Sequence, residues 1–227
     1  MKGRGLLKGT GAMWQRARTE EQIGQRVDAI VRAAGRLYER VMFDDITFAM
    51  IAREADFSRS NMYKYFETKE DVFLAIMCQD MTVWREDVAG VFGGEQKKEW
   101  GVRAFCERWV EVQLGHERMM KLFAIVHTRL ERNCSAKGLV GYKKHLLLEL
   151  RKVEDVVREL FRFRDEGAVV RFLYGQLMMM IGAQPIWDLT EKQVLAMGEA
   201  GMDTNIENYK AIYVEMVEAV LRGVIEE

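Results

Sequence analysis

The feature that most restricts the fold is the spacing of apolar residues, which recur every three or four positions in a chain with a single proline, Pro185. Residues 20–41 give the clearest example, at intervals of four, three, four, three and four: Ile23, Val27, Ile30, Ala34, Leu37 and Val41. This spacing forms one stripe of an amphipathic helix, whereas strands alternate apolar and polar residues. Because proline is poorly tolerated inside helices, its scarcity fits the pattern. The sequence predicts an all-α protein.

Glycines and charges divide the chain into three predicted parts. Helical patterns continue to the cluster Gly90, Gly93 and Gly94 and resume over residues 96–114, 117–132, 136–163, 167–187 and 204–224. We expect an N-terminal domain over residues 20–90 and a C-terminal domain over residues 91–227. The segment 1–19 has five basic residues and no acid: Lys2, Arg4, Lys8, Arg16 and Arg18. It is either a flexible basic arm that follows a phosphate backbone or a solvated tail.

Composition excludes several classes of protein. The chain is 49% hydrophobic and 30% charged, as in soluble globular proteins, and its most apolar stretch, Leu177 to Ala183, is far shorter than the roughly 20 residues that span a bilayer. The first residues have no apolar core typical of a secretory signal. We therefore expect a cytoplasmic protein without membrane contact. The net charge of −1 gives no signal for nucleic acid by itself.

The chain offers no pattern typical of a catalytic or metal site. Its three cysteines and three histidines do not combine at metal-ligand spacings: Cys78, Cys106, Cys134, His116, His127 and His145. No serine, cysteine or carboxylate constellation surrounds a histidine. We expect no enzyme activity, no cofactor and no metal.

Residues 47–66 have the pattern of two short helices joined by a tight turn. Thr47 can cap a helix whose apolar residues Phe48, Ile51, Ala52 and Ala55 share one face. Asp56-Phe57-Ser58 interrupts this pattern, and Ser58 can cap a third helix over residues 59–66. Met62 and Phe66 then point to the interior, which leaves these residues largely outward: Arg59, Ser60, Asn61, Lys64 and Tyr65.

Such a helix-turn-helix can place its second helix in the major groove of double-stranded DNA. Ser60, Asn61 and Lys64 have the size and polarity to reach base edges, while Tyr63, Tyr65 and Lys69 can hold phosphates. In isolation, the same side chains would be interpreted as an ordinary solvated helix face with packed aromatics.

The run IAREADFSRSNMYKYFETKE at residues 51–70 resembles the signature of TetR-type regulators, together with Ala33, Ala34, Leu37, Phe43 and Thr47 upstream. The resemblance implies that Thr47, Tyr63, Tyr65 and Lys69 contact phosphates and that Ser60, Asn61 and Lys64 face bases. Three positions depart from the family pattern: Met42 and Asp56 stand where glycine is usual, and Ile46 where threonine is common. We expect a left-handed backbone at Asp56, which costs a residue other than glycine some stability.

The resemblance also implies a second, helical domain that dimerises through its last two helices and binds a small effector. In agreement, residues 177–181 are apolar around the whole helix and must be covered on more than one side. Gly175 and Gly182 would let another helix approach closely. The implied function is a homodimeric, ligand-responsive repressor that binds palindromic operator DNA.

Several large side chains of the C-terminal domain are candidates for lining a largely apolar effector pocket: Phe105, Trp109, Met120, Phe123, His127 and Trp187. Each of them can instead be simple core. Two other functions are compatible with the sequence. One is a small-molecule-binding or hydrolytic helical protein with a vestigial helix-turn-helix, and the other is a structural helical assembly module.

Overall fold

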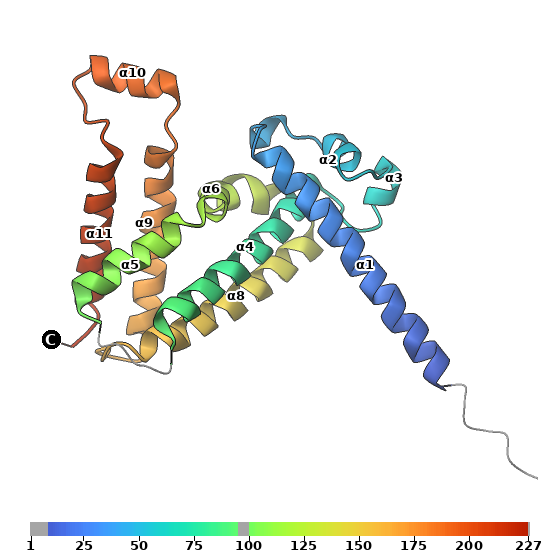
Figure 1. Ribbon diagram of the computed structural model, residues 1–227, viewed down its shortest axis with the longest axis horizontal. Coiled ribbons are helices and arrows are strands. Elements are labelled where there is room, and N and C mark those ends of the chain that lie inside the picture. Colours follow the sequence, from blue (N-terminus) through green and yellow to red (C-terminus); the bar gives the residue numbers. More distant parts are fainter. Residues whose placement is uncertain (1–8, 95–99, 227) are drawn as a thin grey trace, which may run out of the picture. The chain divides into compact units, whose positions relative to one another are not determined.

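A computed structural model describes residues 9–94 and 100–226, with side chains at residue 19 and from residue 21 onward in these ranges. The described chain consists of helices connected by turns, which confirms the all-α prediction (Figure 1). Among the described residues, one isolated bridge between Phe163 and Ile225 is the only β-type pairing. The chain divides into two compact units at Ile76 and Met77.

The N-terminal unit contains the described residues up to Ile76 and the short segment Asn133–Ser135. Its elements in chain order are α1 (Gly9–Tyr38), the 3₁₀ turn η1 (Phe43–Asp45), α2 (Phe48–Glu54), α3 (Arg59–Met62) and the first residues of α4 (Lys69–Phe92). The core of this unit draws one or more buried side chains from each α-helix: Ile30, Ala34, Leu37, Ile51, Met62 and Phe73. The stripe predicted for the first helix is therefore its core face from Ile30 onward.

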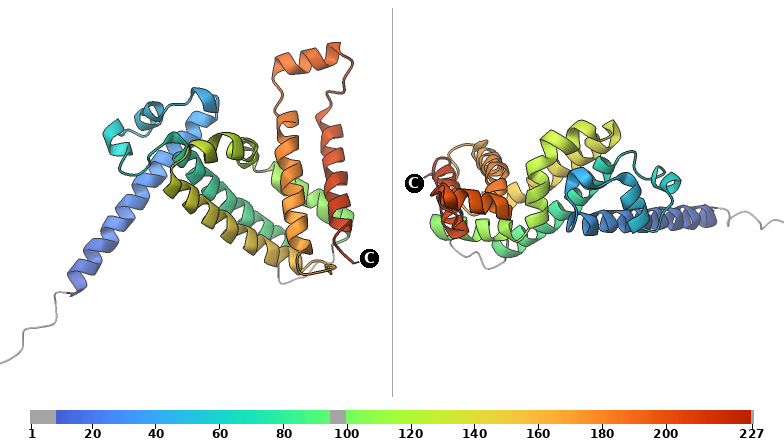
Figure 2. Two further views of the ribbon diagram at one scale, coloured as in Figure 1. Left: turned by 180° about the vertical axis from the view of Figure 1, so that it is seen from behind. Right: turned by 90° about the horizontal axis from the view of Figure 1, so that it is seen from above.

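The C-terminal unit begins at Met77, inside α4. Its further elements are α5 (Val102–Leu114), α6 (Glu117–Ile125), the π-helix η2 (Val126–Leu130), α7 (Glu131–Asn133), α8 (Ala136–Arg158), α9 (Ala168–Trp187), α10 (Glu191–Glu199) and α11 (Ile206–Arg222). Helices α4 and α8 lie side by side (Figures 1 and 2), and Arg85 of α4 donates to the buried carboxylate of Glu149 of α8 at 2.9 Å.

Aromatic rings fill the centre of the C-terminal unit. Trp109 of α5 lies 5.9 Å from the ring of Trp84 and 5.6 Å from the ring of Phe172, measured between centroids. Its indole N–H donates to the side-chain oxygen of Gln176 at 3.3 Å, and the Tyr213 hydroxyl donates to Gln113 at 3.0 Å. Buried polar groups thus pair with each other across α5, α9 and α11.

Helices α9 and α11 pack closely where α9 lacks a side chain. A methyl group at Gly175 would meet Val220 of α11 at 3.1 Å, so the predicted close approach is confirmed there. A methyl group at Gly182 would meet no atom of another described element within 4 Å. Pro185 sits near the end of α9, which stops two residues later at Trp187, because proline removes a backbone donor and crowds the preceding turn.

The boundaries differ from the sequence predictions in several places. The first helix begins at Gly9 instead of residue 20, so the part of the predicted arm from Gly9 onward is helical; residues 1–8 and the side chains of Arg16 and Arg18 lie outside the description. The units separate inside α4 instead of at the glycine cluster that follows it. Helix α5 starts at Val102, and residues 96–99 of the predicted helix are outside the described ranges.

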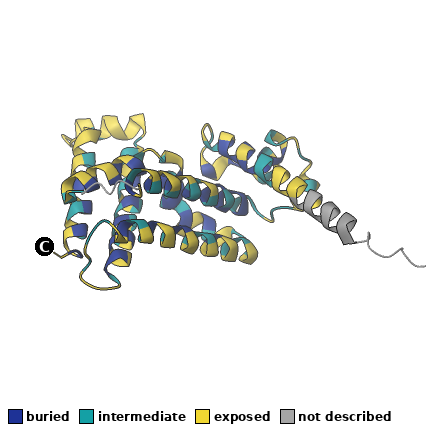
Figure 3. Cartoon of the chain, turned by 60° about the horizontal axis from the view of Figure 1, so that its bottom comes forward, coloured by how far each residue is buried: buried dark blue, intermediate teal, exposed yellow. Residues whose placement is uncertain are grey.

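Helix α10 was not predicted from the sequence. It has no buried residue and is exposed along its length (Figure 3), so its apolar side chains form no stripe against the rest of this chain. A capping box fixes its first turn, because Thr190 accepts from the backbone of Gln193 and the Gln193 side chain accepts from the backbone of Thr190. This pair of residues is the local signal that would have located the helix.

Candidate functional site

Local hydrogen bonds define the helix-turn-helix. Thr47 Oγ1 accepts from the backbone N–H of Met50 at 3.2 Å, and Ser58 Oγ accepts from that of Asn61 at 3.2 Å, so both predicted caps are confirmed. Between them, Asp56 has φ of 58°, the left-handed conformation predicted from the sequence. The N–H of Phe57 bonds back to the carbonyl of Ala52 at 2.8 Å, which closes α2 with the hydrogen bond of a Schellman motif.

Helix α1 braces this motif through ion pairs as well as core packing. Glu54, the last residue of α2, accepts from Arg36 at 3.1 Å and from Arg40 at 2.5 Å. The hydrogen bond from Arg36 is the main reason that the pKa of Glu54 is lowered, and Arg40 adds to the effect. Arg36 of α1 and Arg40, which follows the end of that helix, thereby hold the end of α2 beside α1.

Six of the eight predicted DNA-contacting residues lie on α3 or in the turn after it, whereas Thr47 caps α2 and Lys69 begins α4. Thr47, Arg59, Ser60, Tyr63 and Lys64 are exposed, whereas Asn61 and Tyr65 are half-buried. Regular α-helix ends at Met62, and residues 63–66 continue as looser turns with a bond from Lys64 N–H to the Asn61 carbonyl. The predicted third helix is therefore shorter than residues 59–66, yet its outward face is the predicted one.

Lys69 has a structural role that the sequence did not predict. Its ammonium group donates to the carbonyl oxygens of Phe43 at 2.9 Å and Ile46 at 2.7 Å, and it lies 4.4 Å from the centroid of the Phe43 ring. These bonds tie the start of α4 to the end of η1. An ammonium has three donors, so one remains for the predicted phosphate contact.

Asp71 is the most connected polar group of the N-terminal unit. Its Oδ2 accepts from the backbone N–H of Glu67 at 3.2 Å and Thr68 at 3.1 Å, while the Asp71 N–H donates to Thr68 Oγ1 at 3.1 Å. Its Oδ1 accepts from both the backbone N–H and the hydroxyl of Ser135, at 2.9 and 3.0 Å. Asp71 thus caps the start of α4 and also holds a segment 64 residues away along the chain.

The six candidate pocket residues separate into three environments. Phe105 and Trp109 are fully buried in the aromatic centre, and Phe123 is buried on α6. Met120 and Trp187 line one hollow of about 180 Å³ between α6 and the end of α9. His127 lies apart on η2, where its largely exposed side chain is 3.3 Å from Glu131.

The hollow beside Met120 has a charged rim. Lys121 places its ammonium 2.8 Å from a carboxylate oxygen of Glu117 and 3.0 Å from one of Asp188, and all three residues line the hollow. Sequence reasoning missed Lys121, Gln184 and Asp188, because their positions carry no periodic signal. One cation and two carboxylates leave this rim with a net negative charge, so the hollow disfavours an anionic ligand.

Two family profiles cover almost all of the described residues. The profile described as "Bacterial regulatory proteins, tetR family" matches residues 30–76, and the one described as "Tetracyclin repressor-like, C-terminal domain" matches residues 78–227. The chain belongs to the TetR family. The junction of the two profiles coincides with the division between the compact units of this TetR-family protein.

Solved structures of other regulators share the TetR fold. A protein assigned to the TetR family from Mesorhizobium loti has a TM-score of 0.56 at 15% identity, with 90% of this chain and 98% of that chain covered. The fatty acid degradation regulator FadR from Bacillus halodurans has a TM-score of 0.52 at 15% identity, covering 87% and 95%. SmeT, which represses the multidrug efflux pump SmeDEF of Stenotrophomonas maltophilia, has a TM-score of 0.52 at 14% identity, covering 88% and 91%. Among curated protein sequences, none matches this chain.

Membership of the TetR family makes the protein a DNA-binding transcriptional regulator, and proteins of this family are typically not enzymes. In the described part of the chain, no three or more His, Cys, Asp or Glu residues gather as metal ligands. Burial raises the pKa of Cys78 to about 11 and that of Cys106 to about 12, so both thiols are poor nucleophiles near neutral pH. None of the described helices has the length and apolarity required to cross a membrane.

Proposed function

We propose that this TetR-family regulator is a ligand-responsive repressor that acts in the cytoplasm and binds a palindromic operator as a homodimer. The observation that carries the proposal is the polar, solvent-facing surface of α3, which begins at a capped residue and is held by a buried core. A rigid helix with exposed small polar side chains near its N-terminus is what insertion into a major groove requires.

Contacts with DNA divide between bases and phosphates. Ser60, Asn61 and Lys64 read base edges, and Thr47, Tyr63 and Tyr65 hold the phosphate backbone on either side. Arg59 stands at the start of α3, where its guanidinium is 3.4 Å from the Tyr63 hydroxyl and orients that ring. The third donor of the Lys69 ammonium faces a phosphate while the other two hold the domain together.

The last two long helices, α9 and α11, form the dimer interface. A groove of about 280 Å³ between them has an almost wholly apolar lining that includes Met179, Ile186, Ile212 and Met216. Gly182 also lines this groove and leaves space for the side chains of a second copy. A two-fold dimer presents two copies of α3, so it reads inverted half-sites about 34 to 36 Å apart or a multiple of the DNA turn.

An effector in the C-terminal unit acts on DNA binding through residues 126–135. The π-helix η2 and the short α7 lead from α6 to Ser135, whose two bonds to Asp71 reach the first turn of α4. Single π-helical turns are conformationally costly and are common at functional sites. The effector binds the DNA-competent and DNA-incompetent states unequally, with a coupling of about 1 to 3 kcal/mol.

The test is a selection of genomic fragments by the purified protein at physiological salt, followed by titration of the enriched sequence against scrambled DNA. We expect a palindrome that binds at least roughly a thousandfold more tightly than scrambled DNA. No enrichment, from protein stripped of bound ligand, would refute operator recognition by this chain.

A pair of lysine variants tests whether α3 is the surface that contacts DNA. In the dimer, Lys64→Gln removes one positive charge from each of the two copies of α3, so it should weaken operator binding and reduce its salt dependence by up to about two counterions. Lys144→Gln removes the same charge from an exposed position on α8 and should change neither. Equal effects of the two substitutions would contradict the assignment of α3 as the recognition helix.

A further inference from the structure

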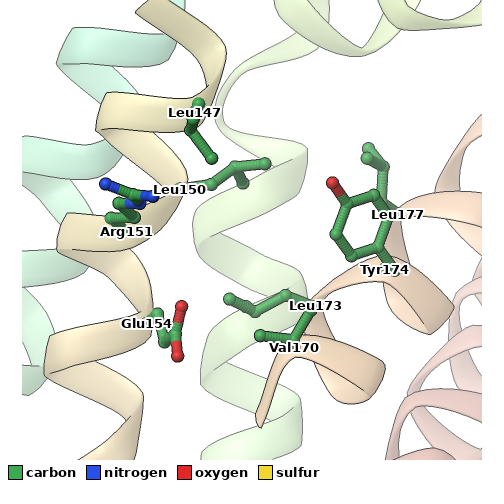
Figure 4. A pocket seen from close by; sticks show the side chains of 8 residues that line it. All are labelled: Leu147, Leu150, Arg151, Glu154, Val170, Leu173, Tyr174 and Leu177. Carbon is green, nitrogen blue, oxygen red and sulfur yellow. The ribbon is translucent and has the colours of Figure 1, made fainter. Parts of the chain in front are cut away.

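A second site in the C-terminal unit lies between α8 and α9. It is a groove of about 250 Å³, open at one side, whose walls are mainly leucine and valine: Leu147 and Leu150 from α8, and Val170, Leu173 and Leu177 from α9. The side chains of Leu150 and Leu173 point into the space between the helices (Figure 4). None of the six candidate residues chosen from the sequence lines it.

The charges around the groove favour an anion. Arg151 lines the groove from α8, and within the described part of the chain no hydrogen bond or ion pair joins its guanidinium to a carboxylate. Glu154, one turn further along α8, is bound by the guanidinium of Arg158. Among the charges that line the groove, the one without an ion-pair partner is therefore positive, in contrast to the hollow at Lys121, where two carboxylates surround one lysine.

The size and the walls define the rest of the ligand. A volume of 250 Å³ equals the volume that about eight water molecules occupy in liquid water. One methylene group occupies about as much space as one water molecule. Leucine and valine walls offer no hydrogen bonds, so they match an alkyl chain of about eight carbons. The Tyr174 hydroxyl at the α9 side adds one donor near the mouth (Figure 4).

We infer that the α8–α9 groove binds a medium-chain alkyl carboxylate, with the chain between the leucines and the carboxylate paired with Arg151. Binding itself does not depend on the function proposed above. We also infer that this ligand is the effector, which rests on the proposed function. Binding of the ligand and its effect on DNA affinity are tested separately.

The test is calorimetric titration of the full chain with sodium octanoate, 1-octanol and octylammonium chloride. We expect octanoate to bind most tightly and octylammonium least. Affinity should rise about fourfold for each methylene from butanoate to octanoate, because each buried methylene contributes a constant increment, and then level off when the groove is full. Failure of octanoate to bind, or tighter binding of octylammonium, would overturn the inference.

Variants of exposed residues assign the carboxylate contact. Arg151→Gln should weaken octanoate binding about fivefold, the effect of a strong solvent-accessible ion pair, and leave octanol binding unchanged. Arg151→Lys should retain part of the affinity, and Glu154→Gln should increase it, because it removes a negative charge and releases Arg158. Lys144→Gln, an equal loss of charge on the same helix, should have no effect. Unchanged octanoate affinity in Arg151→Gln would refute the contact.

Two further measurements separate the possible outcomes. Val170→Trp fills the groove from a partly exposed position and should abolish octanoate binding without changing the oligomeric state. Dissociation of the dimer in this variant would instead identify the groove as an interface between copies and would overturn the ligand site. Titration of operator DNA with and without octanoate then tests the response. Octanoate binding without any change in DNA affinity would support the site and refute its role as the effector site.

Discussion

Removal of the Asp71 carboxylate tests how the N-terminal unit is held together. In Asp71→Ala, four accepted hydrogen bonds of 2.9 to 3.2 Å are lost. Loss of the cap at the start of α4 costs about 1 kcal/mol. The Ser135 N–H, at a partly buried position, loses its charged acceptor, which costs about 1 to 3 kcal/mol more. We therefore expect a total loss of about 2 to 4 kcal/mol in the free energy of unfolding.

Ser135→Ala is the matched, smaller perturbation. It removes the hydroxyl bond of 3.0 Å to Asp71 and keeps the backbone N–H bond to the same oxygen, so we expect the loss of this contact to cost about 1.5 kcal/mol, the value for a hydrogen bond to a charged acceptor. Because both substitutions remove the same contact, the double variant should be less destabilised than the sum of the single ones.

The assay is urea-induced unfolding followed by far-ultraviolet circular dichroism, with amide hydrogen exchange to assign the loss to the N-terminal unit. Faster exchange is expected at Glu67 and Thr68 in Asp71→Ala, since both amides lose their acceptor. Additive effects of the two substitutions, or a greater loss in Ser135→Ala than in Asp71→Ala, would refute the reasoning.

Three other predictions follow from single residues. Asp56→Gly should stabilise the protein by up to about 1 kcal/mol, because φ of 58° is unfavourable for a side chain, and a lower midpoint of thermal unfolding would contradict this. Lys69→Met should lower the stability of the N-terminal unit through loss of two bonds to carbonyls, while Lys64→Met should leave stability unchanged and weaken only DNA binding; unfolding and anisotropy titrations on both variants distinguish the roles. Burial acts to raise the pKa of Glu149, yet Lys152 and Arg85 outweigh it and hold that pKa below its ordinary value. The ionised carboxylate therefore contributes fully to stability above an ordinary carboxyl pKa of about 4.3, and this contribution disappears as the pH falls through the lower pKa of the folded state. The difference in the free energy of unfolding between the wild type and Glu149→Gln should shrink in acid. A constant difference from pH 7 to pH 3 would contradict this.

Most of the helix-turn-helix is determined by the sequence, because its determinants act over short distances. Thr47 and Ser58 each cap the helix that follows, because each side chain accepts from the backbone N–H three residues further on. Asp56 adopts its left-handed conformation within a hydrogen-bonded turn. The side chains that face DNA in the proposed complex follow from helical periodicity once the caps are located. Helix α10 was missed because an exposed helix has no apolar stripe to predict it.

Tertiary structure decided what distant residues do together. Lys69 binds the carbonyl oxygens of residues 43 and 46, and Asp71 binds Ser135. His127, which was grouped with the candidate pocket residues, lies apart from the aromatic centre. The α8–α9 groove likewise depends on how two helices pack, and Arg151 becomes notable because, among the described residues, no ion pair joins it to a carboxylate. Periodicity and capping report the local conformation of the backbone, whereas these contacts depend on which helices meet and in which rotation. That choice is made by packing of the whole core, so a single sequence determines the helices and the tertiary structure determines the sites between them.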